Sequence, residues 1–170
     1  MRVESVQGVP AKIEAVTSDY CLATWARFYI DIWRGNTTME GLQAIQVGFP
    51  GFANRYPSGV GLVTIVEQRA PLPPAPVRNA MAKFLADSAS AIKCSAVVFE
   101  GEGFSAAAVR GVVTGLTLVA RPAYPHKIFA TVPQASAWSA SSIVQAGEPR
   151  VNASEIVTAI AELRTKLTTL

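Results

Sequence analysis

The sequence has few of the residues that build metal sites. It contains one histidine, His126, and two cysteines, Cys21 and Cys94, among 170 residues. The two cysteines stand far apart, each inside an apolar run, and match no known spacing of metal ligands. A zinc site usually combines several histidines and cysteines. We therefore expect no metal site and no cofactor, and we interpret both thiols as small buried apolar side chains.

Charged residues are also scarce. Asp, Glu, Lys and Arg make up 16% of the chain, and the net charge is +3, from 15 Lys and Arg against 12 Asp and Glu. A typical soluble domain has about 25% charged residues. The basic residues are scattered, whereas nucleic-acid binding requires a concentrated basic surface. We expect no nucleic-acid binding, and a surface partly covered by a protein partner or by a second copy of the chain in a homodimer.

Long uncharged apolar runs are missing as well. The most apolar helix expected here runs from residue 106 to residue 120 and contains Arg110. A membrane span needs about 20 apolar residues with few or no charges. The first residues do not combine a charged segment with an apolar core, as a signal peptide does. The sequence therefore predicts a cytoplasmic protein without a membrane span.

Apolar residues are abundant, at 50% of the chain, and the length suits a single domain over residues 1–170. Residues 1–19 carry weak signals, with a strand expected around residues 13–16. Residues 20–33 alternate between two sets of side chains, which predicts one long strand with a single buried face, lying toward an edge of the sheet. A helix is expected to follow, capped by Thr37 or Thr38 and ending near Gly48.

The rest of the chain alternates between short apolar strands and helices. Strands are expected at residues 60–66, 96–99 and 127–132, and helices at residues 77–91, 104–121, 133–144 and 155–167. Such alternation implies parallel strands joined by right-handed crossovers, and continuous apolar strands are typical of sheets covered on both faces. We predict an α/β fold with one mostly parallel sheet flanked by helices. The proline-rich residues 70–76 are expected to form a stiff connection.

The richest candidate site lies between the strand at 96–99 and the helix that follows. It comprises Glu100, Gly101, Glu102, Gly103, Phe104 and Ser105. Ligands of open α/β sheets often bind at the carboxyl ends of strands, and helix N-termini favour anions. Arg110, in the following helix, is either a charge of this site or a surface charge.

Three interpretations of this segment stay open. Gly101, Gly103 and Ala106 fit a dinucleotide fingerprint, but no acidic residue follows at residues 119–132, where a ribose contact would need one. Glu100 and Glu102 could share a site as paired carboxylates, or be solvated side chains of a turn. Ser105 could be a phosphorylated switch near the positive end of the helix, or simply its cap.

The order of elements from Ala75 to Leu170 resembles the STAS domain, the fold of bacterial anti-sigma-factor antagonists, and most closely its divergent SpoIIAA-like branch. In that family a buried strand leads through a loop to a helix that begins with a regulatory Ser or Thr. Here the strand at 96–99, the loop at 100–103 and the helix that opens at Phe104 and Ser105 take those places. The family's Asp-Ser-Ser-Gly signature is replaced by Gly103-Phe104-Ser105-Ala106, so Ser105 alone corresponds to the phosphorylated position.

The sequence shows no nucleophile with a positioned base, so we expect no enzyme activity and no catalytic residues. Together with the resemblance, this favours a regulatory module that binds a protein partner through residues 100–105 and the helix after them. The alternative is a domain that binds a small apolar molecule or a lipid, as in the lipid-carrier-like folds of the SpoIIAA-like branch. In that case Phe49 and Phe52, expected in a turn-rich segment at 48–59, could form a lid over a pocket.

Overall fold

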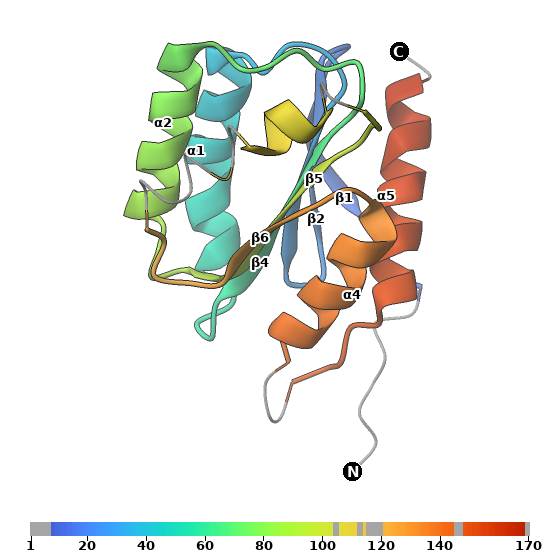
Figure 1. Ribbon diagram of the computed structural model, residues 1–170. Helices are drawn as coiled ribbons and strands as arrows, with labels where there is room; N and C mark the ends of the chain where they lie inside the picture. Colours follow the sequence, from blue (N-terminus) through green and yellow to red (C-terminus); the bar gives the residue numbers. More distant parts are fainter. Residues whose placement is uncertain (1–7, 104–105, 112–113, 115–120, 145–147, 169–170) are drawn as a thin grey trace.

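The computed structural model describes residues 8–103, 106–111, 114, 121–144 and 148–168. A single sheet forms the middle of three layers, with α1 and α2 on one side and α4 and α5 on the other (Figure 1). Two buried apolar clusters fill the spaces between the sheet and these two helical layers. The α/β class and the flanked, mostly parallel sheet that the sequence predicts are therefore confirmed.

The sheet has six strands in the order β1-β2-β3-β4-β5-β6. Their bounds are β1 Lys12–Val16, β2 Tyr20–Trp25, β3 Phe28–Trp33, β4 Val60–Val66, β5 Ile92–Phe99 and β6 His126–Phe129. β2 is antiparallel to both of its neighbours, β1 and β3, whereas the pairs β3–β4, β4–β5 and β5–β6 are parallel. The expected strand near residues 13–16 is thus present, and the strands predicted after residue 60 pair in parallel.

The predicted long strand at residues 20–33 is wrong: it is a hairpin. β2 and β3 are joined by Ala26 and Arg27, and Trp25 faces Phe28 across the turn. Ala26 takes a positive φ of 48°, which a tight hairpin turn requires and which Ala seldom adopts. Both strands are buried on both faces and lie inside the sheet, because β1 covers the edge of β2.

The helices are α1 Met39–Ala53, α2 Ala75–Asp87, α4 Val132–Ser142 and α5 Ala153–Thr168, and residues 106–111 are also helical. Thr38 caps α1 by accepting a hydrogen bond from the Gly41 N–H. The connections from β3 to β4 and from β4 to β5 step across the sheet in one direction. Right-handed crossovers therefore place α1 and α2 on the same face. α4 and α5 cover the opposite face, where they pack on each other.

The predicted turn at residues 48–59 is partly wrong, because α1 continues through Gly48, Pro50 and Gly51 to Ala53. Phe49 and Phe52 are buried on this helix, with their rings 5.6 and 5.8 Å from the ring of Tyr29. Burying the two aromatic side chains contributes about 1.5–3 kcal/mol each, which largely offsets the poor helix propensity of the neighbouring residues. These side chains are therefore part of the core and form no lid.

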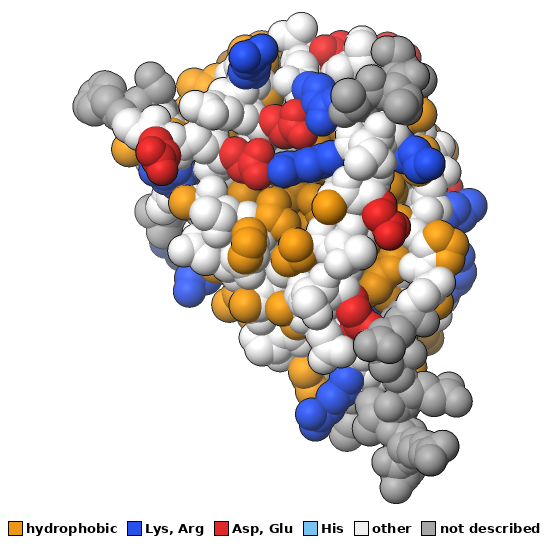
Figure 2. All heavy atoms as spheres, turned by 90° about the vertical axis from the view of Figure 1, so that its right-hand side faces the viewer, with side chains coloured by type: hydrophobic (Ala, Val, Ile, Leu, Met, Phe, Trp, Pro, Cys, Tyr) orange, Lys and Arg blue, Asp and Glu red, His pale blue; other side chains and the backbone are white. Residues whose placement is uncertain are grey.

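The face of the molecule that α4 and α5 form carries both acidic and basic side chains (Figure 2). In Figure 2, which looks onto the α4 and α5 side, basic side chains stand next to acidic ones, and the described residues of this face form no continuous basic surface. Every helix in the described part of the chain is too short or too polar to span a membrane. The expected absence of a membrane span agrees with this finding, while a cytoplasmic location stays a prediction.

Gly61 in β4 leaves no room for a side chain. A Cβ built there would lie 2.4 Å from two ring carbons of Phe28 and 3.1 Å from Cδ1 of Ile143. We expect Gly61→Ala to lower the free energy of unfolding by about 2 kcal/mol, as overpacked cores do. Gly51→Ala, on α1 where nothing lies within 4 Å, is the matched control. It should raise the stability by about 0.5–1 kcal/mol through better helix propensity. Equal effects of the two substitutions in urea unfolding would contradict this packing.

Candidate functional site

Residues 100–103, the first part of the predicted site, form an acidic bend that contains two glycines. This bend lies where expected, at the carboxyl end of β5. Glu102 and Gly103 are exposed, while Phe104 and Ser105 lie outside the described residues. Gly101 and Gly103 have φ values of +124° and +89°, so the backbone of the bend itself explains both glycines. Arg110 is half-buried and its Nη1 donates to the Gly101 carbonyl at 3.5 Å. This contact joins the bend to the helix at residues 106–111.

Glu100 and Glu102 differ in their surroundings. The Glu100 carboxylate forms an ion pair of 2.8 Å with Arg164 on α5, and Arg164 also approaches Glu67 at 3.4 Å. Glu67 in turn pairs with Arg34 at 2.7 Å. Two cations and two carboxylates thus join α5 to the ends of β3, β4 and β5. This network gives Glu100 a structural role, and Glu102 is the exposed acidic group of the bend.

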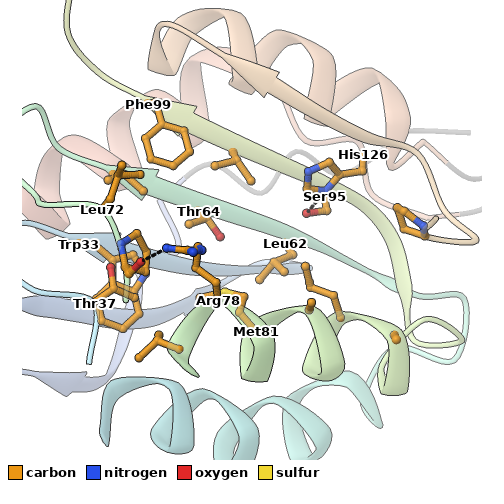
Figure 3. Close-up of a pocket in the computed structure, with 18 of the residues that line it drawn as sticks. Trp33, Thr37, Leu62, Thr64, Leu72, Arg78, Met81, Ser95, Phe99 and His126 are labelled. Carbon is orange, nitrogen blue, oxygen red and sulfur yellow. Dashed lines mark hydrogen bonds between the residues drawn. The ribbon is translucent and has the colours of Figure 1, made fainter. Parts of the chain in front are cut away.

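A separate cavity lies between α2 and the face of the sheet that α2 covers (Figure 3). Its volume is about 120 Å³, and apolar side chains form most of its walls. Two of its lining residues, Leu72 and Ala86, are exposed, so the cavity opens to solvent. The walls comprise Trp33, Thr37, Leu62, Thr64, Val66, Leu72, Pro73, Val77, Arg78, Met81, Ala82, Leu85, Ala86, Ser95, Val97, Phe99, Pro122, Tyr124 and His126. Such a cavity, apolar with a few polar groups, is typical of small-molecule sites.

One end of the cavity carries Arg78 and Thr37. Arg78 lies in the first turn of α2 and its Nη1 donates to the Pro73 carbonyl at 2.7 Å. Within the described part of the chain no carboxylate pairs with this guanidinium. Thr37 is 4% exposed, and its hydroxyl is buried without a hydrogen-bond partner among the described residues. A buried hydroxyl without a partner costs free energy, so this pair of groups is suited to contact a polar atom of a ligand.

Asp31 lies behind the same end of the cavity. It is 1% exposed and accepts hydrogen bonds from Nε1 of Trp33 at 2.8 Å and from Oγ1 of Thr64 at 2.9 Å. Burial raises the pKa of this carboxyl to about 6, although both hydrogen bonds act to lower it. Asp31 thereby holds two wall residues in place without lining the cavity itself.

The other end carries a polar pair, Ser95 on β5 and His126 at the start of β6 (Figure 3). The parallel register places these residues opposite each other, and the Ser95 hydroxyl shares a hydrogen bond of 3.1 Å with Nδ1 of His126. Burial lowers the pKa of His126, so its imidazole is neutral at pH 7. Its Nε2 is buried and has no hydrogen-bond partner in the described structure.

Sequence reasoning missed this cavity. The wall residues come from segments that are separated by more than ninety positions along the chain, since they run from Trp33 to His126. Only the order of the strands, β3 to β6, brings them onto one face. One signal was available: Ser95 directly precedes the apolar run at residues 96–99, and a polar residue that is buried in a strand commonly has a hydrogen-bond partner.

The comparisons with known proteins yield nothing to transfer to this site. No family model, no curated protein and no solved structure matches the chain. The resemblance to STAS domains is therefore neither supported nor contradicted and stays a prediction.

Proposed function

We propose that this protein binds a small, mainly apolar molecule in the cavity between α2 and the sheet. The observation that carries the proposal is the cavity itself, an apolar space on a well-packed sheet with polar groups only at its ends. Transfer of an apolar group from water into such a space is favourable, at about 25 cal/mol per Å² of apolar surface buried. The polar ends would then set the orientation of the ligand.

The volume limits the size of the ligand. An engineered apolar cavity of about 150 Å³ binds benzene, and the cavity here measures about 120 Å³. One ring or a short chain fits, while the remainder of a larger molecule would extend through the opening beside Leu72 and Ala86. A benzene-sized probe is therefore the appropriate test compound.

The pair of Ser95 and His126 is assigned to binding. Ser95 is 1% exposed and is held by His126 through Nδ1. A serine nucleophile would also need donors for an oxyanion and a group that orients the imidazole. Among the described residues, no group forms a hydrogen bond with Nε2 of His126. The buried Nε2 instead offers one hydrogen bond to a polar atom of the ligand.

Binding of benzyl alcohol tests the proposal. By calorimetric titration we expect the purified protein to bind it with a Kd of about 1 mM or tighter. Ala82→Leu adds three carbon atoms to the cavity wall and should weaken binding at least tenfold, because the ring and the new side chain would occupy the same space. Asn79→Leu, on the exposed side of α2, is the control and should bind as the wild type does.

Failure of the wild type to bind, or equal binding by all three proteins, would contradict the proposal. Native mass spectrometry of freshly purified protein adds a direct search for the natural ligand. A stoichiometric small molecule that is present in the wild type and absent from Ala82→Leu would support the site.

The rival hypothesis is a regulatory module that binds a protein partner, alone or as a homodimer. Its support is the exposed bend at Glu102 and Gly103 on the rim of the sheet. Phosphorylation of Ser105 would belong to this hypothesis. Interaction capture with the wild type and with Ser105→Asp tests this hypothesis. We expect the wild type to capture a specific protein partner that the variant does not capture. Capture of the same proteins by both would argue against the hypothesis.

A further inference from the structure

We infer that the ligand carries an acidic group, and that Arg78 and Thr37 bind this group. The ligand class would be small organic acids, with an apolar ring or chain in the cavity and a carboxylate at the Arg78 end. This inference depends on the proposed function and makes it more specific.

Arg78 is the single charged residue among the described lining residues. No aspartate or glutamate lines the walls, and His126 at the far end is neutral at pH 7, since burial lowers its pKa. The Arg78 guanidinium has five N–H donors. Among the described residues its one hydrogen bond goes from Nη1 to the neutral Pro73 carbonyl, which leaves donors and the positive charge available. An apolar cavity with one uncompensated cation favours an anionic ligand.

Thr37 also lines the cavity. This residue is 4% exposed, and its buried hydroxyl has no hydrogen-bond partner among the described residues. Thr38, not Thr37, caps α1, so the Thr37 hydroxyl has no structural task in the helix. A carboxylate oxygen would accept the hydrogen bond that this hydroxyl lacks.

The fold places these two groups at the same end of the cavity. Thr37 follows β3, and Arg78 follows the connection from the carboxyl end of β4, so both lie beyond the carboxyl ends of parallel strands. Figure 3 shows them together near Trp33, away from Ser95 and His126. Arg78 also lies in the first turn of the 13-residue helix α2, where the helix dipole is positive. Three independent contributions at this end therefore favour negative charge.

The experiment compares benzoate with benzyl alcohol, which share a ring and differ in charge. The measured quantity is the ratio of the two dissociation constants at pH 7. We expect the wild type to bind benzoate at least tenfold more tightly. Arg78→Met should reduce this ratio to about one or below. Arg69→Met removes one exposed positive charge outside the cavity and should keep the wild-type ratio.

Thr37→Val separates a binding role from a structural one. Because the hydroxyl is buried without a partner, the isosteric valine should raise the Tm of the free protein. The same change should lower the benzoate preference, since the carboxylate loses a donor. If Thr37 had only a structural role, Thr37→Val would raise the Tm and leave the preference for benzoate unchanged. That result would overturn the binding role of Thr37.

The outcomes distinguish the inference that the ligand is an acid from the proposal that the cavity binds a small molecule. If both compounds bind the wild type equally, or if Arg78→Met keeps the preference for benzoate, the acid-binding inference is overturned and the cavity proposal stands. If neither compound binds, both are overturned. A preference for benzoate that disappears with Arg78→Met and persists with Arg69→Met supports the inference.

Discussion

Replacing Asp31 by asparagine is expected to remove about 3 kcal/mol of pH dependence from the free energy of unfolding. Burial raises the pKa of this carboxyl from 3.8 to about 6. One pKa unit corresponds to about 1.4 kcal/mol, and the side chain is buried too deeply for solvent to screen it. Asparagine can keep both hydrogen bonds, accepting from Trp33 and donating to the Thr64 hydroxyl, so its fold should remain intact.

The sign of the effect follows from proton linkage. Below about pH 4 the carboxyl holds its proton in both states, and wild type and variant should be similarly stable. Between about pH 4 and pH 6 the unfolded chain releases the proton while the folded chain retains it, so wild-type stability falls relative to Asp31→Asn. Above about pH 6 the difference should be constant, with the variant more stable.

Urea unfolding at pH 4, 5, 6 and 7 measures this difference, because effects of the other titrating groups cancel between wild type and variant. Asp87→Asn, on the exposed surface of α2, serves as the control and should follow the wild-type profile. A constant difference between wild type and Asp31→Asn across this range would contradict the assigned environment of Asp31.

Replacing Arg27 by methionine should destabilise the protein by about 3 kcal/mol. The Arg27 side chain is 8% exposed in the turn between β2 and β3. It donates to Ser58 Oγ at 2.8 Å and to the Gly59 carbonyl, and it forms an ion pair with Glu148. Loss of one partner of a buried pair costs about 3–5 kcal/mol, and Glu148 is 30% exposed, so we expect the lower end.

Arg150→Met is the matched control for this prediction. Arg150 is exposed and lies two residues after Glu148, and surface substitutions of this kind change stability by about 0.5 kcal/mol or less. Denaturant midpoints of both variants give the comparison. If Arg27→Met loses no more stability than Arg150→Met, the turn is not held by these contacts.

The elements that sequence reasoning located correctly are those with one dominant local signal. Val60–Val66 is a nearly continuous apolar run, and the structure makes the same residues β4. The hairpin at Ala26 and Arg27 gave no such signal, because it contains no Gly, Asn or Pro and the alternation continues through it. Tertiary contacts of Arg27 hold this turn. In the last part of α1 the local sequence favours a turn, and the packing of aromatic side chains determines the helix instead.

The candidate site was predictable only in part. The acidic bend was placed at the end of β5, because Glu100 and Gly101 directly follow the apolar run that ends at Phe99. Its chemistry could not be predicted, because the partner of Glu100 is Arg164, on a helix more than sixty positions away. Ser95 and His126 meet only through the register of β5 with β6. Contacts set by register and by layer packing leave no pattern in a single sequence.

Methyl NMR tests the central claim most directly, because it shows where a small molecule binds. On titration with benzyl alcohol we expect the methyl signals of Leu62, Met81 and Val97, which line the cavity, to shift together along one binding curve. The side chains of Ile65 and Val98 pack in the core cluster on the other face of the sheet, so the chemical shifts of their methyl groups should not change. No shifts at saturating probe, or shifts of equal size on both faces of the sheet, would contradict a binding cavity between α2 and the sheet.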